Sequence, residues 1–315
     1  MTKTMVVGLT FTDIKGFCAG EYHPRERNLG SVAFCQGGVS RNVALNLARA
    51  GQRVGFASMV DDSALGHDAL RCLQEEGVDV RHVRAVPERG MGMWMVILDE
   101  NGDVAGQISC VPDLSQLEAL WEQEGEEILA GADNIVLEID TTERLVEQVL
   151  TAAQRLGKPV YPIVGNMSVI LRRRDFLARC GCFVCNELEA GRLFDTDLSR
   201  ESPESVLAFL LEQPWRFPMP PTVITMGERG VVYADYPRGT AGYCPAIPTE
   251  LLDSSGAGDA FLSGTVAALG RGYTLEEAVR VGTRMASLTI RTAESACPRC
   301  DGIWQDVPAH ALHLP

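Results

Sequence analysis

The sequence lacks the long apolar stretches of a membrane or secreted protein. No run of about 18 apolar residues occurs in the 315 residues, so we expect no segment to span a membrane. The first four residues lead straight into the apolar Met5–Leu9, without the apolar region and small-residue cleavage site of a signal peptide. The sequence therefore predicts a protein of the cytoplasm.

The sequence is also short of positive charge. Lys and Arg number 28 against 42 Asp and Glu, which gives a formal net charge of −14. General binders of nucleic acids or acidic membranes need a basic face, so we expect neither partner. ATP is not excluded, because backbone N–H groups and Mg²⁺ can hold its phosphates at one local site.

The ten cysteines do not form a compact disulfide framework, because they are scattered over the whole chain. Two CxxC pairs stand out, Cys182/Cys185 and Cys297/Cys300. A structural zinc site would need a second pair beside Cys297 and Cys300, and the alternation around Cys182 and Cys185 is that of a buried strand. We expect reduced thiols, with zinc as the less favoured alternative.

Two common nucleotide-binding motifs are missing as well. The chain has two Gly-rich loops, at 37–38 and 256–258, and neither contains the GxGxxG of dinucleotide-binding folds. The GxxxxGK[ST] of P-loop proteins does not occur either. A dinucleotide-dependent oxidoreductase and an ordinary P-loop enzyme are therefore disfavoured.

What the sequence does contain is a regular alternation of predicted strands and helices. Apolar runs predict strands at 5–9, 53–60, 134–139, 158–164, 182–185 and 222–226. Helices are predicted at about 36–51, 65–76, 115–130, 142–156 and 168–179, then two before residue 213, and finally at 257–270 and 274–291. This order predicts an α/β fold, with a mostly parallel sheet covered on both faces, in a single domain of residues 1–315.

Two segments fall outside this rhythm and predict a small β lid. Residues from about 14 to 35 show little periodicity and hold several glycines. The segment from about 90 to 110 has the form of a β-hairpin, with Asn101-Gly102 as its turn. A parallel sheet does not need a hairpin between its βα units, so we expect this one to pair with the strands that follow Asp13.

The motif Gly256-Ala257-Gly258-Asp259 precedes an apolar helix and carries the strongest chemical signal. Small residues let the backbone approach a ligand, and the helix start offers unpaired N–H groups and its positive dipole end to an anion. Phosphoryl transfer needs such donors beside a base that accepts a hydroxyl proton. Taken alone, however, the motif is also that of an ordinary helix start with a favourable carboxylate.

A second Gly-rich helix start lies at Gly37-Gly38, with Asn42 one turn inside the helix. Paired glycines permit close approach to a polar ligand, and the Asn42 amide can donate to and accept from hydroxyl groups. A plain tight turn explains this motif equally well when it is taken by itself.

Together and in this order, the two motifs resemble those of the pfkB (ribokinase-like) family of carbohydrate and nucleoside kinases. The family's DxxGAGDxF is matched in full at 253–261, and its GGxxxN at 37–42. The resemblance covers nearly the whole chain. It implies a ribokinase-like three-layer α/β/α sandwich with a small β-sheet lid, and an ATP-dependent transfer of the γ-phosphate to a hydroxymethyl group.

The resemblance also implies roles on the acceptor side of the site. Asp259 is similar to the family's catalytic base, and Gly256, Ala257 and Gly258 to its anion hole. Asp13, which we place at the end of the first strand, matches the Asp that accepts hydrogen bonds from two sugar hydroxyls. Gly37, Gly38 and Asn42 would bind the substrate beside it.

On the nucleotide side the resemblance implies a further set of residues. Asn186-Glu-Leu-Glu189 is similar to the family's NxxE, in which Glu189 helps to place Mg²⁺ through water and Asn186 faces the phosphates. Without the family, Asn186 is simply a good N-cap. The stretch from Thr225 through Gly227 to Gly230 resembles the family's ATP loop, although strand–turn–strand is its plain interpretation.

Asp253 and Ser255 lie where some relatives hold K⁺, but residues 290–297, which would supply the other ligands, show no clear match. Three more residues keep two interpretations each. Phe11 could stack on a base or sugar, or fill the core. Glu138, near the end of its strand, could reach the substrate or Mg²⁺, or be a buried paired carboxylate. Arg41 could contact substrate or phosphate, or be a solvated side chain.

Gly37-Gly-Val-Ser-Arg-Asn-Val-Ala44 looks closer to the GGVxRNxA of pseudouridine kinases than to the ribokinase version, so pseudouridine is the first substrate expected. A ribokinase-like or other sugar kinase is the alternative, and a non-catalytic sugar or nucleotide sensor on the same fold is a third hypothesis. If lid strands pair across subunits, as in some relatives, the protein would be a homodimer.

Overall fold

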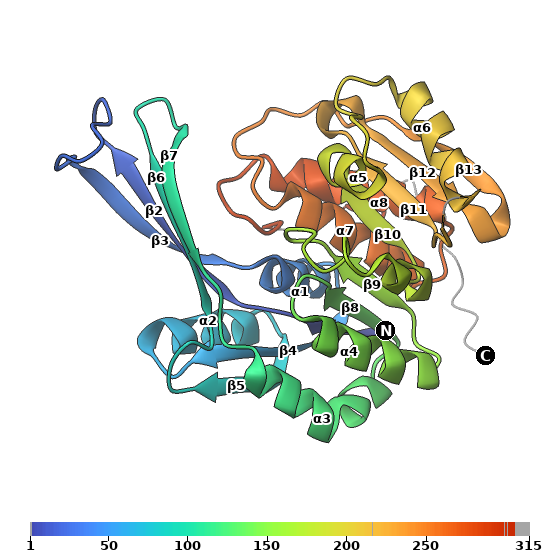
Figure 1. Cartoon of the computed structure of the whole chain (residues 1–315), viewed down its shortest axis with the longest axis horizontal. Helices are drawn as coiled ribbons and strands as arrows, with labels where there is room; N and C mark the ends of the chain where they lie inside the picture. Colours follow the sequence, from blue (N-terminus) through green and yellow to red (C-terminus); the bar gives the residue numbers. More distant parts are fainter. Residues whose placement is uncertain (1, 216, 299, 301, 306–315) are drawn as a thin grey trace.

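We analysed a computed structural model of the chain, which describes residues 2–215, 217–298, 300 and 302–305. A five-stranded parallel sheet forms its centre (Figure 1). In order across the sheet, its strands are β5 (Asp79–Val86), β4 (Arg53–Asp61), β1 (Lys3–Val7), β8 (Asn134–Glu138) and β9 (Val160–Ile163). The predicted parallel sheet is confirmed.

A second, four-stranded sheet continues from the β9 side of the first. Its strands are β10 (Phe183–Asn186), β11 (Thr222–Thr225), β12 (Val231–Asp235) and β13 (Thr240–Cys244). Strands β10 and β11 are parallel, whereas β12 and β13 are antiparallel to their neighbours. The Gly181 amide donates to the Val160 carbonyl (2.7 Å), which links the β10 end of this sheet to β9.

Helices cover both faces of these sheets, as the alternation predicts (Figure 1). They are α1 (Val39–Arg49), α2 (Ala64–Glu75), α3 (Ser115–Ala130), α4 (Glu143–Arg155), α5 (Glu187–Phe194), α6 (Pro203–Glu212), α7 (Ala257–Leu269) and α8 (Leu275–Thr289). In β1, Met5 and Val7 join the core formed by α3 and α4, while Val6 joins the core of α1, α7 and α8. Successive side chains of a strand point to opposite faces, so one strand serves two cores. The α/β fold with helices on both faces is confirmed.

A third sheet stands apart from the other two, and we call it the lid sheet (Figure 1). Its strands, in order, are β3 (Gly30–Gly37), β2 (Phe11–Cys18), β6 (Gly92–Leu98) and β7 (Val104–Cys110). The expected hairpin is β6–β7, and it pairs with β2, the strand that contains Asp13. The lid segments predicted at about 14–35 and 90–110 are thus strands of one sheet, with β2 starting three residues earlier than expected.

Asp13 was expected at the end of the first strand, and this was wrong. The first strand ends at Val7, and Asp13 is the third residue of β2 in the lid sheet. Past Val7, the Leu9 amide donates to the Glu138 carboxylate (2.9 Å) instead of to a neighbouring strand. The chain therefore leaves the central sheet before Asp13, which pairs with Cys35 and Trp94.

The helix predicted at 168–179 was also wrong. Turns lead into a short 3-10 helix, Arg174–Arg179. The Asp140 carboxylate accepts hydrogen bonds from four backbone N–H groups between Gly165 and Val169, at 2.9–3.1 Å. Met167 has a left-handed φ of 67°. These contacts from a distant residue hold the segment in a turn, and local periodicity gave no sign of them.

Strands β5 and β13 were not predicted, and β12 was expected only in the plain interpretation of the stretch from Thr225 to Gly230. β12 follows β11 after the short 3-10 turn Gly227–Arg229, and the two strands pair antiparallel. The stretch from Thr225 to Gly230 therefore has the strand–turn–strand form that was its plain interpretation.

The cysteine expectations can be compared with the structure in part. Cys182 and Cys185 are buried at β10, as the alternation predicted. Cys297 and Cys300 are buried too, and within the described ranges no group of three or more His, Cys, Asp or Glu side chains could hold a metal ion. None of the helices described there has the length and apolar character to cross a membrane.

Candidate active site

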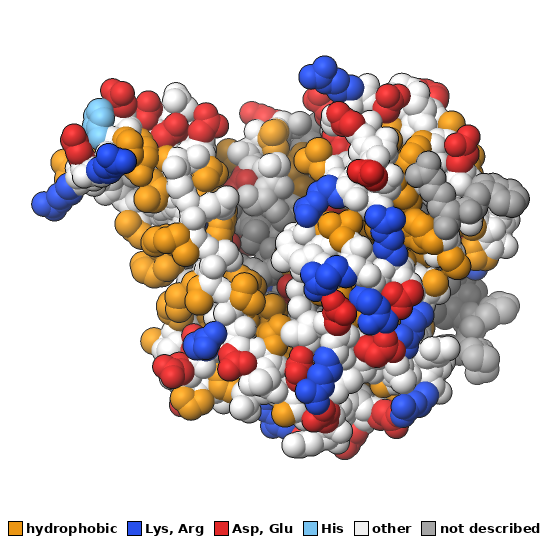
Figure 2. Space-filling model, in the orientation of Figure 1, with side chains coloured by type: hydrophobic (Ala, Val, Ile, Leu, Met, Phe, Trp, Pro, Cys, Tyr) orange, Lys and Arg blue, Asp and Glu red, His pale blue; other side chains and the backbone are white. Residues whose placement is uncertain are grey.

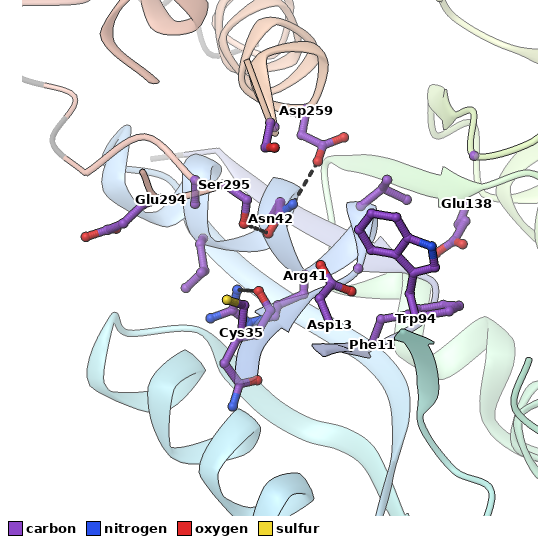
Figure 3. A pocket seen from close by; sticks show the side chains of 18 of the residues that line it. Phe11, Asp13, Cys35, Arg41, Asn42, Trp94, Glu138, Asp259, Glu294 and Ser295 are labelled. Carbon is purple, nitrogen blue, oxygen red and sulfur yellow. Dashed lines mark hydrogen bonds between the residues drawn. The ribbon is translucent and has the colours of Figure 1, made fainter. Parts of the chain in front are cut away.

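A cavity of about 840 Å³ lies between the lid sheet and the helix starts of α1 and α7 (Figure 3). Among the residues singled out from the sequence that line it are Asp13, Gly38, Asn42, Gly256 and Asp259. They come from positions up to 246 residues apart in the chain (259 − 13). The structure therefore brings the two Gly-rich motifs and the lid carboxylate to one place.

The first turn of α7 is open to a ligand. Gly256 is its N-cap, with a left-handed φ of 74° and no side-chain capping bond. The Ala257 amide donates to the Ser254 carbonyl (3.2 Å), but no backbone carbonyl in the described part of the chain accepts from the Gly258 or Asp259 amide. Unpaired N–H groups at a helix start suit an anion. The Gly256 amide has no backbone acceptor in that part of the chain either. Gly256 and Gly258 of the expected anion hole, together with Asp259, therefore keep backbone donors for a phosphate.

The start of α1 is equally open. Gly38 is the N-cap, with φ 99° and no side-chain capping bond. At Gly37, any side chain would collide with the Asp13 carboxylate. Glycine at this position therefore lets the Asp13 carboxylate lie directly against the backbone that leads into α1.

A short chain of hydrogen bonds joins the two helices inside the cavity (Figure 3). Asn42 of α1 donates from Nδ2 to the Asp259 carboxylate oxygen Oδ2 of α7 (2.9 Å). Its other amide atom, Oδ1, accepts from the Ser295 hydroxyl (3.2 Å). Asn42 is therefore fixed in orientation, and it presents its N–H to the carboxylate.

Burial raises the pKa of Asp259 to about 7. The hydrogen bond from Asn42 opposes this rise of the pKa, and the negative charges of Glu138 and Glu189 contribute to it. A general base is most effective when its pKa lies near the working pH. Asp259 is therefore suited to take a proton from a hydroxyl group at neutral pH.

Asp13 faces Asp259 and Asn42 across the cavity (Figure 3). Burial raises the pKa of this carboxyl group as well, whereas the positive charges of Lys15 and Arg41 act to lower it. An ionised carboxylate is an acceptor for up to several hydrogen bonds. Its position on a lid strand suits it to hold hydroxyl groups of a ligand that lies below the lid.

Glu138 is the buried, paired carboxylate of the two alternatives, although it also lines the cavity. Its Oε2 accepts from the Leu9 amide (2.9 Å) and from the Ser40 hydroxyl (2.7 Å). Burial raises its pKa. Any side chain at position 8 would collide with Ser40 and Glu138. This cluster therefore depends on Gly8.

Arg41 is not the solvated side chain of its plain interpretation. It is only 8% exposed, and its Nη1 donates to the Gln36 carbonyl (3.1 Å). Phe11 also lines the cavity and packs partly against the core, so both of its interpretations hold in part.

The residues expected on the nucleotide side lie together but do not line this cavity. Asn186 and Thr225 are neighbours in register at the ends of β10 and β11. Asn186 forms a capping box with Glu189: its Oδ1 accepts from the Glu189 amide and the Glu189 carboxylate accepts from the Asn186 amide, both at 2.8 Å. The plain N-cap interpretation of Asn186 therefore applies here. Gly227 and Gly230 both have positive φ, at the two ends of the turn that follows β11.

Three residues of the site region were not predicted from the sequence. Asp140 follows the end of β8 and fixes the turn at 165–169, and a carboxylate just beyond a parallel strand was a usable signal. Trp94 lies opposite Asp13 on β6, and the two-residue alternation of the hairpin could have placed it on the inner face. Ser295 follows α8 in an irregular segment, which gave no signal.

The acidic residues around the cavity suit a magnesium ion bound with a nucleotide. The charge of Asp140 acts on both Glu138 and Glu189, and the charges of these two act on Asp259. Mg²⁺ prefers oxygen ligands, keeps several waters, and is usually bound through one or two carboxylates plus phosphate oxygens. A site of that kind does not require the cage of three protein ligands that is missing from the described residues.

Comparisons with known proteins agree with this arrangement. The family model for pfkB family carbohydrate kinases matches residues 1–298. The chain belongs to this family. It is accordingly an ATP-dependent kinase of a carbohydrate or nucleoside.

The relatives it resembles include kinases of nucleosides and of sugars. It is 34% identical to the guanosine-inosine kinase of Exiguobacterium acetylicum, over 94% of this chain and 96% of the relative. It is 26% identical to the pseudouridine kinase of Escherichia coli K12, over 91% and 90% of the two chains. The structure of Arabidopsis thaliana ribokinase with ribose and ATP has the same fold, with a TM-score of 0.82, 21% identity and coverage of 96% and 98%.

Proposed function

We propose that the protein transfers the γ-phosphoryl group of MgATP to the 5′-hydroxyl of a nucleoside. The observation that carries this proposal is the state of Asp259. Its side chain is half-buried in the cavity, desolvation there raises its pKa to about 7, and it stands in the first turn of an uncapped helix. It shares its cavity with Asp13, which faces it from the lid.

Each residue has one task in this reaction. Asp13 and Asn42 hold the ribose hydroxyls, so that the 5′-hydroxyl lies next to Asp259. As the hydroxyl oxygen forms its bond to the γ-phosphorus, its proton passes to the Asp259 carboxylate. The bond between the γ-phosphorus and the β,γ-bridging oxygen breaks, and ADP leaves. The amides of Gly258 and Asp259 stabilise the charge on the transferred group.

The nucleotide side is proposed from the family resemblance and from the neighbourhood of β10 and β11. Thr225, Gly227 and Gly230 would contact ATP, and Asn186 would face its phosphates. Glu189 would hold Mg²⁺ through water, and the metal ion supplies charge neutralisation for the phosphates. Asp253 would bind a monovalent cation together with the segment after α8. The two segments lie side by side, because the Leu252 and Asp253 amides both donate to the Ile290 carbonyl (2.8 and 3.3 Å).

A nucleoside is proposed over a free sugar because of the relatives. By its name, the relative with 34% identity acts on guanosine and inosine. The pseudouridine kinase relative is 26% identical over 91% of this chain, and the ribokinase of Bacillus subtilis is 26% identical over 81% of it. The cavity volume of about 840 Å³ is within the range of sites for drug-sized ligands. Guanosine and inosine are therefore the first candidates, and pseudouridine, which the GGVSRN motif favoured, is the second.

The test is ADP release from MgATP over a panel of guanosine, inosine, adenosine, pseudouridine, uridine, D-ribose and D-fructose. We expect kcat/KM for at least one nucleoside to exceed that for every free sugar by about tenfold or more. Turnover of sugars alone would contradict the nucleoside proposal. Stabilisation of the protein by a sugar or nucleoside without any ADP release would instead support the sensor hypothesis.

We also propose that a second copy of the chain covers the outer face of the lid sheet. Phe34, Ile14, Met95 and Ile108 are register neighbours across its four strands, on the face turned away from the cavity. Phe34 and Ile108 are 62% and 64% exposed, and hydrophobic side chains gather along this side of the sheet (Figure 2). The strand residues of this face include no charged side chain. Two copies of the chain, each with a net charge of −14, can therefore meet there without bringing like charges into contact.

Sedimentation of the purified protein tests the dimer. We expect a dimer at micromolar concentration, and a monomer after the double substitution Phe34→Lys and Ile108→Lys. Tyr243→Lys changes an exposed residue of the other end of the molecule and should leave the dimer intact. A monomeric wild-type protein would refute the proposal.

We place the enzyme in the cytoplasm, where ATP and free nucleosides meet.

A further inference from the structure

Asp13 divides the cavity roof into two sides. On the inner face of the lid sheet, Cys35, Asp13, Trp94 and Ser109 are register neighbours on β3, β2, β6 and β7. All four line the cavity. A ribose held by Asp13 can therefore direct its base either toward Cys35 or toward Trp94.

The side beyond Cys35 is charged, and of its two arginines Arg49 is paired with carboxylates. Arg41 is buried there and donates to the Gln36 carbonyl. Arg49 donates to the Glu76 carboxylate (2.5 Å) and to the Cys297 carbonyl (2.9 Å), and it also pairs with Glu294 (3.4 Å). A neutral, flat base would bury these ions without replacing their partners, which is costly.

The side beyond Trp94 is aromatic. The Phe11 ring lies directly over Gly92, where any side chain would collide with it. Next along the strand, Trp94 points toward the cavity beside Phe11 (Figure 3). Its indole N–H donates to the Gln107 side chain (2.9 Å), which fixes the orientation of the ring. Aromatic faces of this kind are the usual platforms on which nucleobases stack.

The same cavity is also lined by Gly165 and Asn166, in the turn that Asp140 holds with four hydrogen bonds. The Asn166 Oδ1 accepts from the Ser168 amide (2.8 Å). This contact fixes which end of the side-chain amide points inward to the turn. The end that remains for a ligand is Nδ2, which is a donor and suits a carbonyl oxygen.

From these contacts we propose that the base of the nucleoside lies against the Trp94 indole, with a carbonyl edge toward Asn166 Nδ2. The inference rests on the proposed nucleoside kinase function and names the part of the substrate that selects it. A 6-oxopurine or a uracil-type base offers the carbonyl oxygen. Adenine offers an amino group at the same place, so that donor would meet donor.

The first experiment compares nucleosides with D-ribose on the same variants, each measured as a substrate or as a competitor. Trp94→Ala should raise KM or Ki for guanosine and inosine by roughly 5- to 150-fold, the usual effect of losing one stacked base. The same substitution should change KM or Ki for D-ribose by less than about twofold. Trp94→Phe should restore most of the loss. Leu211→Ala removes an exposed apolar side chain from α6, outside the cavity and the lid sheet, and is the control.

The second experiment exchanges the donor for an acceptor. Asn166→Asp can keep the hydrogen bond from the Ser168 amide, but it replaces Nδ2 with an oxygen. We expect the preference for inosine over adenosine, as a ratio of kcat/KM, to fall by about tenfold or more. An unchanged ratio would overturn the proposed role of Asn166.

The outcomes distinguish the proposed nucleoside kinase function from the proposed position of the base. If the wild-type protein phosphorylates sugars but no nucleoside, the proposed function fails, whatever Trp94 does. If it phosphorylates nucleosides and Trp94→Ala affects nucleosides and ribose equally, the base lies elsewhere and this inference fails. Quenching of tryptophan fluorescence by inosine, present in the wild type and lost in Trp94→Phe, would support the contact without any turnover.

Discussion

Helices α7 and α8 follow one another in the chain and pack together, yet their first turns are built in opposite ways. The start of α8 is closed by a capping box, in which the Thr274 hydroxyl accepts from the Glu277 amide (3.3 Å) and the Glu277 carboxylate accepts from the Thr274 amide (2.9 Å). The start of α7 has a glycine at its N-cap and no side-chain cap. The first arrangement stabilises the helix by itself, whereas the second leaves donors for a ligand.

The same contrast separates α1 from α5. α1 also begins at an uncapped glycine, and its Asn42 meets Asp259 of α7 inside the cavity. Helix α5, expected to face the phosphates, has a closed start formed by Asn186 and Glu189. Helix α3 also lacks a side-chain cap, but its N-cap is Leu114 and it does not line the cavity. On the acceptor side, an uncapped glycine begins both helices that face the ligand. On the nucleotide side, closed caps can still present a carboxylate.

The largest effect in this comparison is expected at Asp259. Asp259→Asn keeps the shape of the side chain but removes the base, so kcat should fall by about 10²- to 10⁴-fold, while the Kd for ATP, measured by calorimetry, stays within about threefold. The folded protein should not lose stability, because a buried charge is removed. A kcat within tenfold of the wild type would show that Asp259 is not the base.

The pH dependence gives the next largest effect. Because burial raises the pKa of Asp259 to about 7, kcat/KM should rise about tenfold per pH unit below 7 and level off above it. Stability should change in the opposite sense: the unfolded carboxyl loses its proton near its ordinary pKa of 3.8 and the folded one near 7, so this group's contribution falls as pH rises between these values. A flat rate profile from pH 5.5 to 8 would contradict this assignment.

Two glycines of one turn sharpen the comparison further. Gly256→Ala places a methyl group against the Ser295 carbonyl at a left-handed φ, and should cost about 1–3 kcal/mol of unfolding free energy along with activity. At Gly258 nothing lies within 4 Å of an added methyl group and φ is ordinary, so Gly258→Ala should not destabilise the protein. Chemical denaturation of both variants measures the difference, and equal losses would contradict the strain at Gly256.

The smallest effect is expected at α8. Thr274→Ala removes the cap and should lower the unfolding free energy by about 0.5–2 kcal/mol, with kcat unchanged within about twofold. Thr274→Ser keeps the hydroxyl and should behave as the wild type in both thermal unfolding and activity. A large fall in kcat for Thr274→Ala would mean that the closed start also serves the reaction.

Local signals allowed much of this molecule to be predicted. The parallel sheet, the lid hairpin and the open starts at Gly38 and Gly256 follow from periodicity and from glycines within a few residues of each feature. The failures came from contacts between distant residues. Asp140 holds the turn at 165–169 that was predicted as a helix, and Glu138 ends the first strand before Asp13.

The position of Asp13 on β2 has a mechanical consequence. Only Gly8, Leu9 and Thr10 separate β1 of the central sheet from β2 of the lid sheet. A sugar bonded to both Asp13 and Asn42 would act as a crossbar between the lid and the helical body, and its arrival would draw the roof down over the reacting groups. With ATP alone, this link between the lid and the helical body would be missing. Water would keep its access to the cavity, but the assembled site that phosphoryl transfer requires would not form, which would limit hydrolysis of ATP.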